Sequence, residues 1–333
     1  MLVLREKEVF SLLSNLSPEE ARRLLNRLHD VLREFSRSHH LAPEERNIHQ
    51  PERAAIVTKL GNTSLFMPCS LTTSTAVKVV TLNSAGSLKG AINVFTPEGD
   101  LVGVLNAMEV TAFRTSLAVM IPYVRFVHKK TNIVVFGAGR QAEWHIKLAL
   151  LLNKVDNVTV VNRSSPRRME QLFAKLAEAH PGTSFNLLLK TDVDYDAHLR
   201  RVLTDSDVIF CCTPATTPHF PYAYLDARPR FISLIGSYKP SMQEVDSQTL
   251  LSGGRIYVDT KDGCLTESGE LINANVTEDQ LVEVGELQND EPLETERNLV
   301  FKCVGLGLMD ITIARELLTM AEKEKMGFSV DDF

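Results

Sequence analysis

An apolar segment, residues 132–136, leads directly into Gly-Ala-Gly and then into a helix-like sequence, and this arrangement restricts the possible folds. Glycine permits the tight turn and lets the backbone approach a pyrophosphate, while the helix N-terminus offers N–H groups to an anion. The third small position of the pattern is Ala142, which the turn tolerates. We therefore predict a dinucleotide-binding turn formed by Gly137, Ala138, Gly139, Arg140 and Gln141.

The context of this turn is an alternation of short apolar strands and amphipathic helices. A strand–helix turn without a ligand is the alternative, but the alternation is typical of βαβ units in a doubly wound parallel sheet. The sequence thus predicts a Rossmann domain of the α/β class. The predicted strands are residues 132–137, 158–162, 185–189, 207–213, 231–237 and 255–259.

The second predicted strand ends in Asn162-Arg163-Ser164, and this end bears on cofactor choice. NAD sites usually end this strand in an acidic residue that binds the ribose hydroxyls, whereas arginine can pair with a 2′-phosphate. Arg167 and Arg168 follow closely. The pattern favours NADP(H) over NAD(H). Alternatively, these basic residues form only an exposed helix start, and cofactor choice stays open.

The N-terminal third of the chain predicts an α+β domain. Ser17 and Glu20 form a capping box around Pro18, which starts an amphipathic helix. Short strands with turns follow between residues 56 and 105, and a helix is expected over residues 107–124. A last amphipathic helix closes the chain over residues 305–327.

Two cations stand at positions where the local pattern favours apolar residues. Lys78 shares one strand face with Ala76 and Val80, and Arg114 lies beside the apolar stripe that contains Phe113. Buried cations need carboxylate partners or a bound anion. We expect an anionic substrate; a structural ion pair or snorkelling to water is the alternative.

Composition excludes several classes of function. The net charge is −6 and no segment is strongly basic, which argues against nucleic acid and anionic membranes as partners. The early charged residues do not form a secretory signal, and no apolar run is long enough to span a membrane. The five cysteines lack metal-binding spacing, so we expect reduced thiols, no metal site and a cytoplasmic location.

The region after Asp259 is expected to begin as a linker. Between residues 278 and 296 there are eight acidic residues and no basic one. Such a charge run is typical of a solvated helical face, and this segment is predicted as one.

Nine segments, taken in order, resemble the ornithine cyclodeaminase/μ-crystallin family, and the resemblance extends from about Leu2 to Gly327. It implies a substrate-binding and homodimerisation domain at residues 1–125 with 305–333, and an NAD(P)-binding Rossmann domain at residues 126–304. The C-terminal helix completes the first domain. The segments are QPER, LFMP, VKVV, EVTAFRTSLA, VVFGAGRQA, VNRS, CTPATTPHFP, LIGSYKPSMQEVD and FKCVGLGLMD.

The resemblance also implies roles for individual residues. Arg53, Lys78 and Arg114 match the family's cluster around the substrate carboxylate, and the lysine is its candidate for proton transfer. The remaining implied contacts are to the cofactor. They are Thr115, Thr213, Pro214, Ala215, Ile235, Gly236, Ser237, Lys302 and Val304.

One departure from the family pattern bears on the reaction. Ornithine cyclodeaminases carry Gly-Asp where this chain has Gly236-Ser237. A carboxylate can manage the proton transfers of cyclodeamination, whereas a serine hydroxyl alone cannot. The sequence therefore favours NAD(P)H-dependent reduction of small imine carboxylates, such as pyrroline- or piperideine-carboxylate, to amino acids. The alternatives are an ornithine cyclodeaminase-type lyase that releases ammonia and a non-catalytic, crystallin-like protein that binds NADP and a small ligand.

Overall fold

The computed structural model describes residues 1–164, 167–288 and 291–331. The chain divides into two compact units: Met1–Thr115 with Gly305–Phe333, and Ser116–Val304. The division falls inside helix α3 (Ala107–Arg125). Residues 116–125, which sequence analysis assigns to the first domain, thus belong to the second unit.

The first unit contains a sheet with the order β16-β1-β7-β6-β5-β4-β2, and β3 also pairs with β4. Strands β4 to β7 are antiparallel neighbours and form the predicted series of short strands with turns. The bounds are β1 (Leu2–Leu4), β2 (Ile48–His49), β3 (Ala54–Val57), β4 (Thr63–Leu71), β5 (Ser74–Leu82), β6 (Leu88–Phe95), β7 (Leu101–Asn106) and β16 (Phe328–Ser329).

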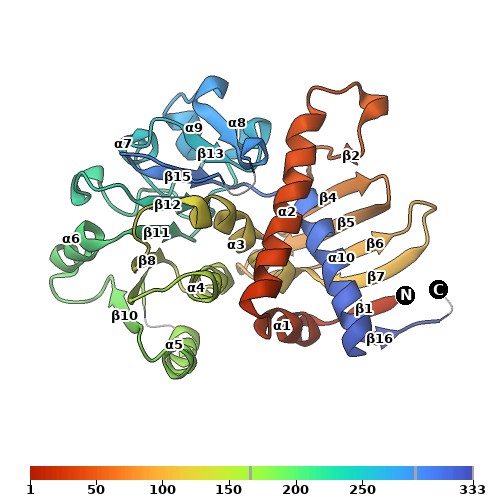
Figure 1. Cartoon of the computed structure of the whole chain (residues 1–333), viewed down its shortest axis with the longest axis horizontal. Coiled ribbons are helices and arrows are strands. Elements are labelled where there is room, and N and C mark those ends of the chain that lie inside the picture. The colour runs from red at the N-terminus through yellow and green to blue at the C-terminus, as the bar shows by residue number, and fades with distance from the viewer. Residues whose placement is uncertain (165–166, 289–290, 332–333) are drawn as a thin grey trace. The chain divides into compact units, whose positions relative to one another are not determined.

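Helices cover one face of this sheet. Helix α10 (Gly307–Glu324) packs against β4, β5 and β6 and lies beside α2 (Pro18–Ser38), as Figure 1 shows within this unit. Helix α2 begins as predicted, because Ser17 accepts a hydrogen bond from the Glu20 N–H and the Glu20 side chain accepts one from Ser17 N–H. The unit also contains α1 (Glu6–Ser14) and η1 (Pro43–Glu45).

The second unit contains a parallel sheet with the order β10-β9-β8-β11-β12-β15-β13-β14, which confirms the predicted Rossmann architecture. Strand β15 lies between β12 and β13 in the sheet, although it comes after β14 in the sequence. The bounds are β8 (Asn132–Phe136), β9 (Asn157–Asn162), β10 (Ser184–Leu189), β11 (Val208–Cys211), β12 (Phe231–Leu234), β13 (Ile256–Val258), β14 (Leu281–Glu283) and β15 (Leu299–Lys302).

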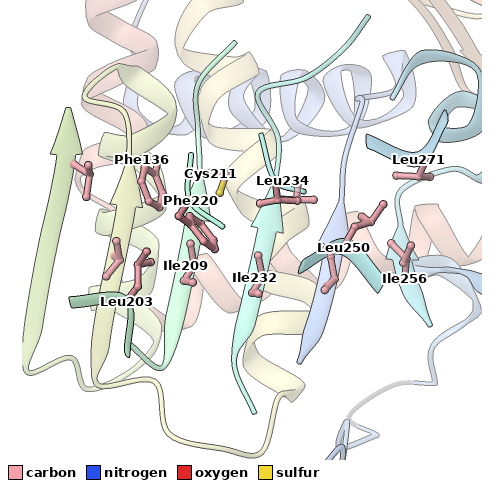
Figure 2. Packing of buried hydrophobic residues seen from close by; sticks show 14 of the residues in the cluster. Phe136, Leu203, Ile209, Cys211, Phe220, Ile232, Leu234, Leu250, Ile256 and Leu271 are labelled. Carbon is pink, nitrogen blue, oxygen red and sulfur yellow. The ribbon is translucent and has the colours of Figure 1, made fainter. Parts of the chain in front are cut away.

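The core of the second unit lies between this sheet and its helices. Ile209 and Ile232 lie side by side on the neighbouring strands β11 and β12. Phe136, Cys211 and Leu234 lie at the ends of their strands, at one edge of the sheet (Figure 2). Burying each such side chain stabilises the fold by about 1.5–3 kcal/mol. The helices are α4 (Arg140–Leu152), α5 (Arg167–Ala179), α6 (Tyr195–Asp205), η2 (Tyr222–Tyr224), α7 (Ser247–Leu251), α8 (Lys261–Glu267), α9 (Gly269–Asn273), η3 (Glu278–Gln280) and η4 (Val284–Glu286).

Two predictions for the region after Asp259 are wrong. The expected linker contains α8 and α9. The expected helical face of residues 278–296 is instead η3, β14 and η4, while residues 289–290 lie outside the described part. Leu281 and Glu283 are both buried because β14 pairs in parallel with β13. A short strand at the end of the sheet therefore replaces the predicted solvated helix.

Candidate functional site

Lys78 lies on the buried face of β5 in the first unit. Its neighbours across the sheet are Met67 on β4 and Ile92 on β6, both buried. The side chain is only 2% exposed, and Nζ lies 2.6 Å from Asp310 Oδ2. The strand alternation thus places a cation in the layer between the sheet and α10, as the sequence pattern indicates.

Asp310 connects Lys78 to Arg114. Arg114 Nε donates a hydrogen bond of 3.1 Å to Asp310 Oδ1, so each carboxylate oxygen faces a different cation. Arg114 is also buried, and its guanidinium packs against Gly305, where a Cβ would lie 2.7 Å from Arg114 Nη1. Gly305 also has φ +91°, a backbone conformation that favours glycine, so a side chain at this position would be strained as well as crowd the guanidinium.

Sequence reasoning missed Asp310. The available signal was an acid inside the apolar stripe of the last helix, where Met309 and Ile313 are buried as well. This is the same kind of signal that identified Lys78 on its strand. A buried charge on one element indicates an opposite charge on another, but the sequence does not say which elements meet.

The pKa of Lys78 is lowered to about 8, and burial is the largest cause. The guanidinium groups of Arg114 and Arg53 act in the same direction as burial, whereas the carboxylate of Asp310 opposes them. Arg53 is half-buried. The three predicted cations are thus electrostatic neighbours, and their lysine can release or take up a proton close to neutral pH.

In the second unit the glycine turn follows β8 as predicted. Gly137 has φ +105°, and a Cβ there would lie 2.8 Å from Thr213 Cγ2, so only glycine fits without strain. Gly139 is the exposed N-cap of α4 and adds no side chain in front of the helix N–H groups. Ala138, Arg140 and Gln141 are half-buried around this turn. The turn matches a pyrophosphate cradle.

The end of β9 carries the residues that bear on cofactor choice. Asn162 Nδ2 donates a hydrogen bond of 2.6 Å to the Ser164 carbonyl, and Arg163 is exposed beside them. Arg168 forms an ion pair with Glu143 on α4, with an Nη2–Oε2 distance of 2.5 Å. Of these two arginines, Arg163 is the one whose side chain is exposed directly at the end of the strand.

The loops after β11 and β12 are joined by a buried carboxylate. Glu244 Oε1 accepts a hydrogen bond of 2.9 Å from Thr213 N–H, and Oε2 accepts one of 2.7 Å from Gly236 N–H. Pro214 is exposed and Ala215 is half-buried in the first loop. Sequence reasoning missed Glu244, which lies inside the motif LIGSYKPSMQEVD.

Ser237 and Lys302 lie together in the interior. Lys302 Nζ donates hydrogen bonds to the Ser237 carbonyl and hydroxyl at 2.7 and 2.5 Å, and the hydroxyl donates to Glu270 Oε2 at 2.5 Å. Ile235 is half-buried before them. The side chains of Ser237 and Lys302 therefore both have hydrogen-bond partners inside the protein.

Two other residues implied by the resemblance are held by backbone contacts. Val304 N–H donates a hydrogen bond of 3.2 Å to Asp259 Oδ1. Thr115 Oγ1 donates one of 2.8 Å to the Thr111 carbonyl within α3.

Within residues 1–164, 167–288 and 291–331, no group of His, Cys, Asp or Glu side chains could hold a metal ion. None of the helices in that part of the chain is both long and apolar enough to cross a membrane.

Comparisons with known proteins give a family for the chain. The sequence model of the ornithine cyclodeaminase/mu-crystallin family matches residues 11–325. An uncharacterized protein from Saccharomyces cerevisiae is 28% identical over 96% of this chain and 97% of its own length. A Delta(1)-pyrroline-2-carboxylate reductase from Bacillus thuringiensis is 24% identical over 61% of this chain and 62% of its own length.

A solved structure matches the whole fold. It is the Thermococcus litoralis Delta(1)-pyrroline-2-carboxylate reductase in complex with NADH and L-proline. The TM-score is 0.82 at 21% sequence identity, and the match covers 99% of this chain and all of the other.

Proposed function

Because the chain belongs to the ornithine cyclodeaminase/mu-crystallin family, we propose that it is an NAD(P)H-dependent reductase of small imines that carry a carboxylate. The observation that carries this proposal is the buried contact of Lys78 with Asp310, beside Arg114. Such a cluster combines a proton donor with cations suited to a carboxylate. The dinucleotide fold of the second unit supplies the other half of the reaction.

The reaction adds a hydride to the imine carbon and a proton to the imine nitrogen, which converts C=N into CH–NH. Reduced nicotinamide supplies the hydride when bound. Lys78 holds the proton at Nζ, and its lowered pKa makes transfer to a nitrogen easier than from an ordinary lysine. Arg53 and Arg114 hold the substrate carboxylate, and Asp310 holds Lys78 in place. Positioning of this kind can supply about 7–11 kcal/mol of the barrier.

The cofactor fits the residues of the second unit. Gly137 and Gly139 leave room for a pyrophosphate at the start of α4. We propose that NADP(H) is preferred, because Arg163 is exposed where an acidic residue would otherwise bind the ribose.

The substrate is proposed to be a cyclic ketimine such as pyrroline-2-carboxylate or piperideine-2-carboxylate. Support comes from the relatives named as pyrroline-carboxylate reductases. Ser237 gives further support, because it stands where cyclodeaminases carry an acid and its hydroxyl is already bonded to Glu270.

The test is oxidation of NADPH and of NADH with each cyclic ketimine, run beside ornithine with ammonia detection. We expect imine-dependent oxidation of the cofactor, faster with NADPH, and no ammonia. Ammonia from ornithine without net cofactor oxidation would identify a cyclodeaminase instead. Cofactor binding with no turnover in either assay would identify a binding protein.

The first unit also supports a proposed homodimer. The sheet face opposite Lys78 carries Phe66, Val79 and Ala91, which pair across β4, β5 and β6 and are half-exposed. Neighbouring half-exposed apolar side chains are suited to a protein–protein interface. One of the solved structures of the same fold is described as an alanine dehydrogenase dimer.

A further inference from the structure

We propose that Glu244 is a positioning residue for the nicotinamide half of the cofactor site. The inference rests on the proposed cofactor binding, but not on the identity of the substrate. Glu244 is fully buried and lies in the segment that follows β12. It would act on the cofactor through the two loops that its carboxylate joins.

The Glu244 carboxylate connects the loops that follow two neighbouring strands. The loops begin where β11 and β12 end, at Cys211 and Leu234, which lie at the same edge of the sheet (Figure 2). The N–H groups of Thr213 and Gly236 both point at Glu244, one to each oxygen. A carboxylate can accept both bonds because both of its oxygens are acceptors.

The backbone around Glu244 strengthens this connection. His219 N–H donates to the Glu244 carbonyl at 2.8 Å, and Gln243 N–H donates to the Ala215 carbonyl at 2.8 Å. A Cβ at Gly236 would lie 1.9 Å from the Thr213 carbonyl oxygen, so the two loops touch at a position that only glycine allows. The loop after β11 is therefore held along its length.

A second buried carboxylate fixes the first one. Glu270 Oε1 accepts a hydrogen bond of 2.9 Å from Glu244 N–H, and its other oxygen accepts from Ser237 and Ser268. Burial, the largest single influence, raises the pKa of Glu270. Lys302 Nζ, 3.9 Å from Glu270 Oε2, and the hydrogen bonds to the carboxylate lower it, and the net direction is downward. The Glu244 backbone and the Gly236-Ser237 turn are thus anchored to the same interior charge pair.

The strand order places this connection in the nicotinamide half. In a doubly wound sheet, the strands on one side of the first strand bind the adenine half and those on the other side bind the second nucleotide. Here β9 and β10 lie on one side of β8, and β11 and β12 lie on the other. The Glu244 connection should therefore affect the nicotinamide more than the adenine.

The decisive variant is Glu244→Gln, which keeps the size of the side chain but replaces one acceptor oxygen with an NH2 donor. That group would face an N–H donor, so one of the two loop contacts is lost. The matched control is Asp207→Asn. Asp207 Oδ2 accepts from the N–H groups of Thr131 and Asn132, both at 3.0 Å, at the opposite edge of the same sheet.

The measurement is direct binding of NADPH and NADH, with ADP and adenosine 2′,5′-bisphosphate as fragments that lack nicotinamide. We expect Glu244→Gln to weaken dinucleotide binding by about tenfold and to leave fragment binding within about twofold. Asp207→Asn, whose amide oxygen can still accept both N–H bonds, should leave both kinds of ligand within about twofold. If Glu244→Gln does not fold, Glu244→Asp, which keeps the charge but shortens the reach, should show the same selectivity.

Equal loss of dinucleotides and fragments in the Glu244 variants, or no loss of either, would overturn the proposal. So would a wild-type protein that binds neither dinucleotide. A wild type that binds NADPH but reduces no imine would contradict the proposed reductase activity, but it would not contradict the proposed role of Glu244. In an active enzyme, the apparent KM for the cofactor should rise in Glu244→Gln more than in Asp207→Asn.

Discussion

At the scale of single residues, the site depends on one buried lysine whose charge is costly. Lys78 is enclosed between the sheet and α10, where burial favours its neutral form and Asp310 favours its charged form. The balance lowers its pKa from 10.5 to about 8. A lysine on the surface would hold its proton too tightly to exchange it near neutral pH.

Imine reduction should depend on pH through the proton of Lys78. Lys78 donates in its protonated form, so kcat/KM should fall as the pH rises through about 8. Asp310→Asn removes the group that raises this pKa, and the falling limb should move to lower pH. Lys78→Met should abolish turnover and leave cofactor binding intact.

The control is Lys89→Met, since Lys89 is an exposed lysine on the neighbouring strand β6. Its pH profile should match that of the wild type. An Asp310→Asn pH profile that coincides with the wild-type profile would show that the Lys78–Asp310 contact does not set the pKa of the proton donor.

At the scale of elements, two helices begin in opposite ways. Helix α2 is capped by Ser17 and Glu20, which satisfy each other's N–H groups. The N-cap of helix α4 is Gly139, which has no side chain that could accept a bond from these N–H groups. A helix start without a capping side chain keeps its N–H groups and its positive end available to an anion.

A side chain that caps α4 should therefore compete with the cofactor. Gly139→Asp should place a carboxylate at the N-cap of α4, where no atom of the described residues, apart from Gly139 and its chain neighbours, lies within 4 Å of a new Cβ. We expect unchanged or higher stability but about tenfold weaker NAD(P)H binding, because the new charge competes with the pyrophosphate. Ser17→Ala is the reciprocal control and should cost about 1 kcal/mol of unfolding free energy without affecting the cofactor. Undiminished cofactor affinity in Gly139→Asp would argue against a pyrophosphate at this turn.

At the scale of the whole molecule, the chain returns to its first unit after completing the second. The last helix, α10, supplies Asp310 to Lys78 and covers one face of the sheet in that unit. The opposite face keeps half-exposed apolar side chains such as Val79 and Phe66. We expect a second copy of the chain to cover that face.

A charged residue on this face should disrupt the proposed homodimer. Val79→Arg should convert a homodimer into monomers, because burying an unpaired guanidinium in an apolar interface is costly. Glu98→Arg, in the exposed turn between β6 and β7, should leave the dimer unchanged. Sedimentation velocity measures both. A wild type that sediments as a monomer would refute the dimer, and a Val79→Arg dimer would place the interface elsewhere.

Local sequence patterns predict the features that depend on spacing over a few residues. The glycine turn, the capping box at Ser17 and the buried side of Lys78 follow from short patterns, because backbone geometry repeats over a few residues. The acidic composition of residues 278–296 was misleading, since charge indicates exposure but not helix, and β14 forms only by pairing with β13.

The contacts between residues that are distant in the sequence follow from how the elements pack in the fold. Asp310 lies against Lys78, and Glu244 joins the loops at Thr213 and Gly236, although these residues come from separate elements. Each residue alone is merely a buried acid. Its role depends on the strand order and helix packing, which satisfy all of the buried groups together and which no local pattern encodes.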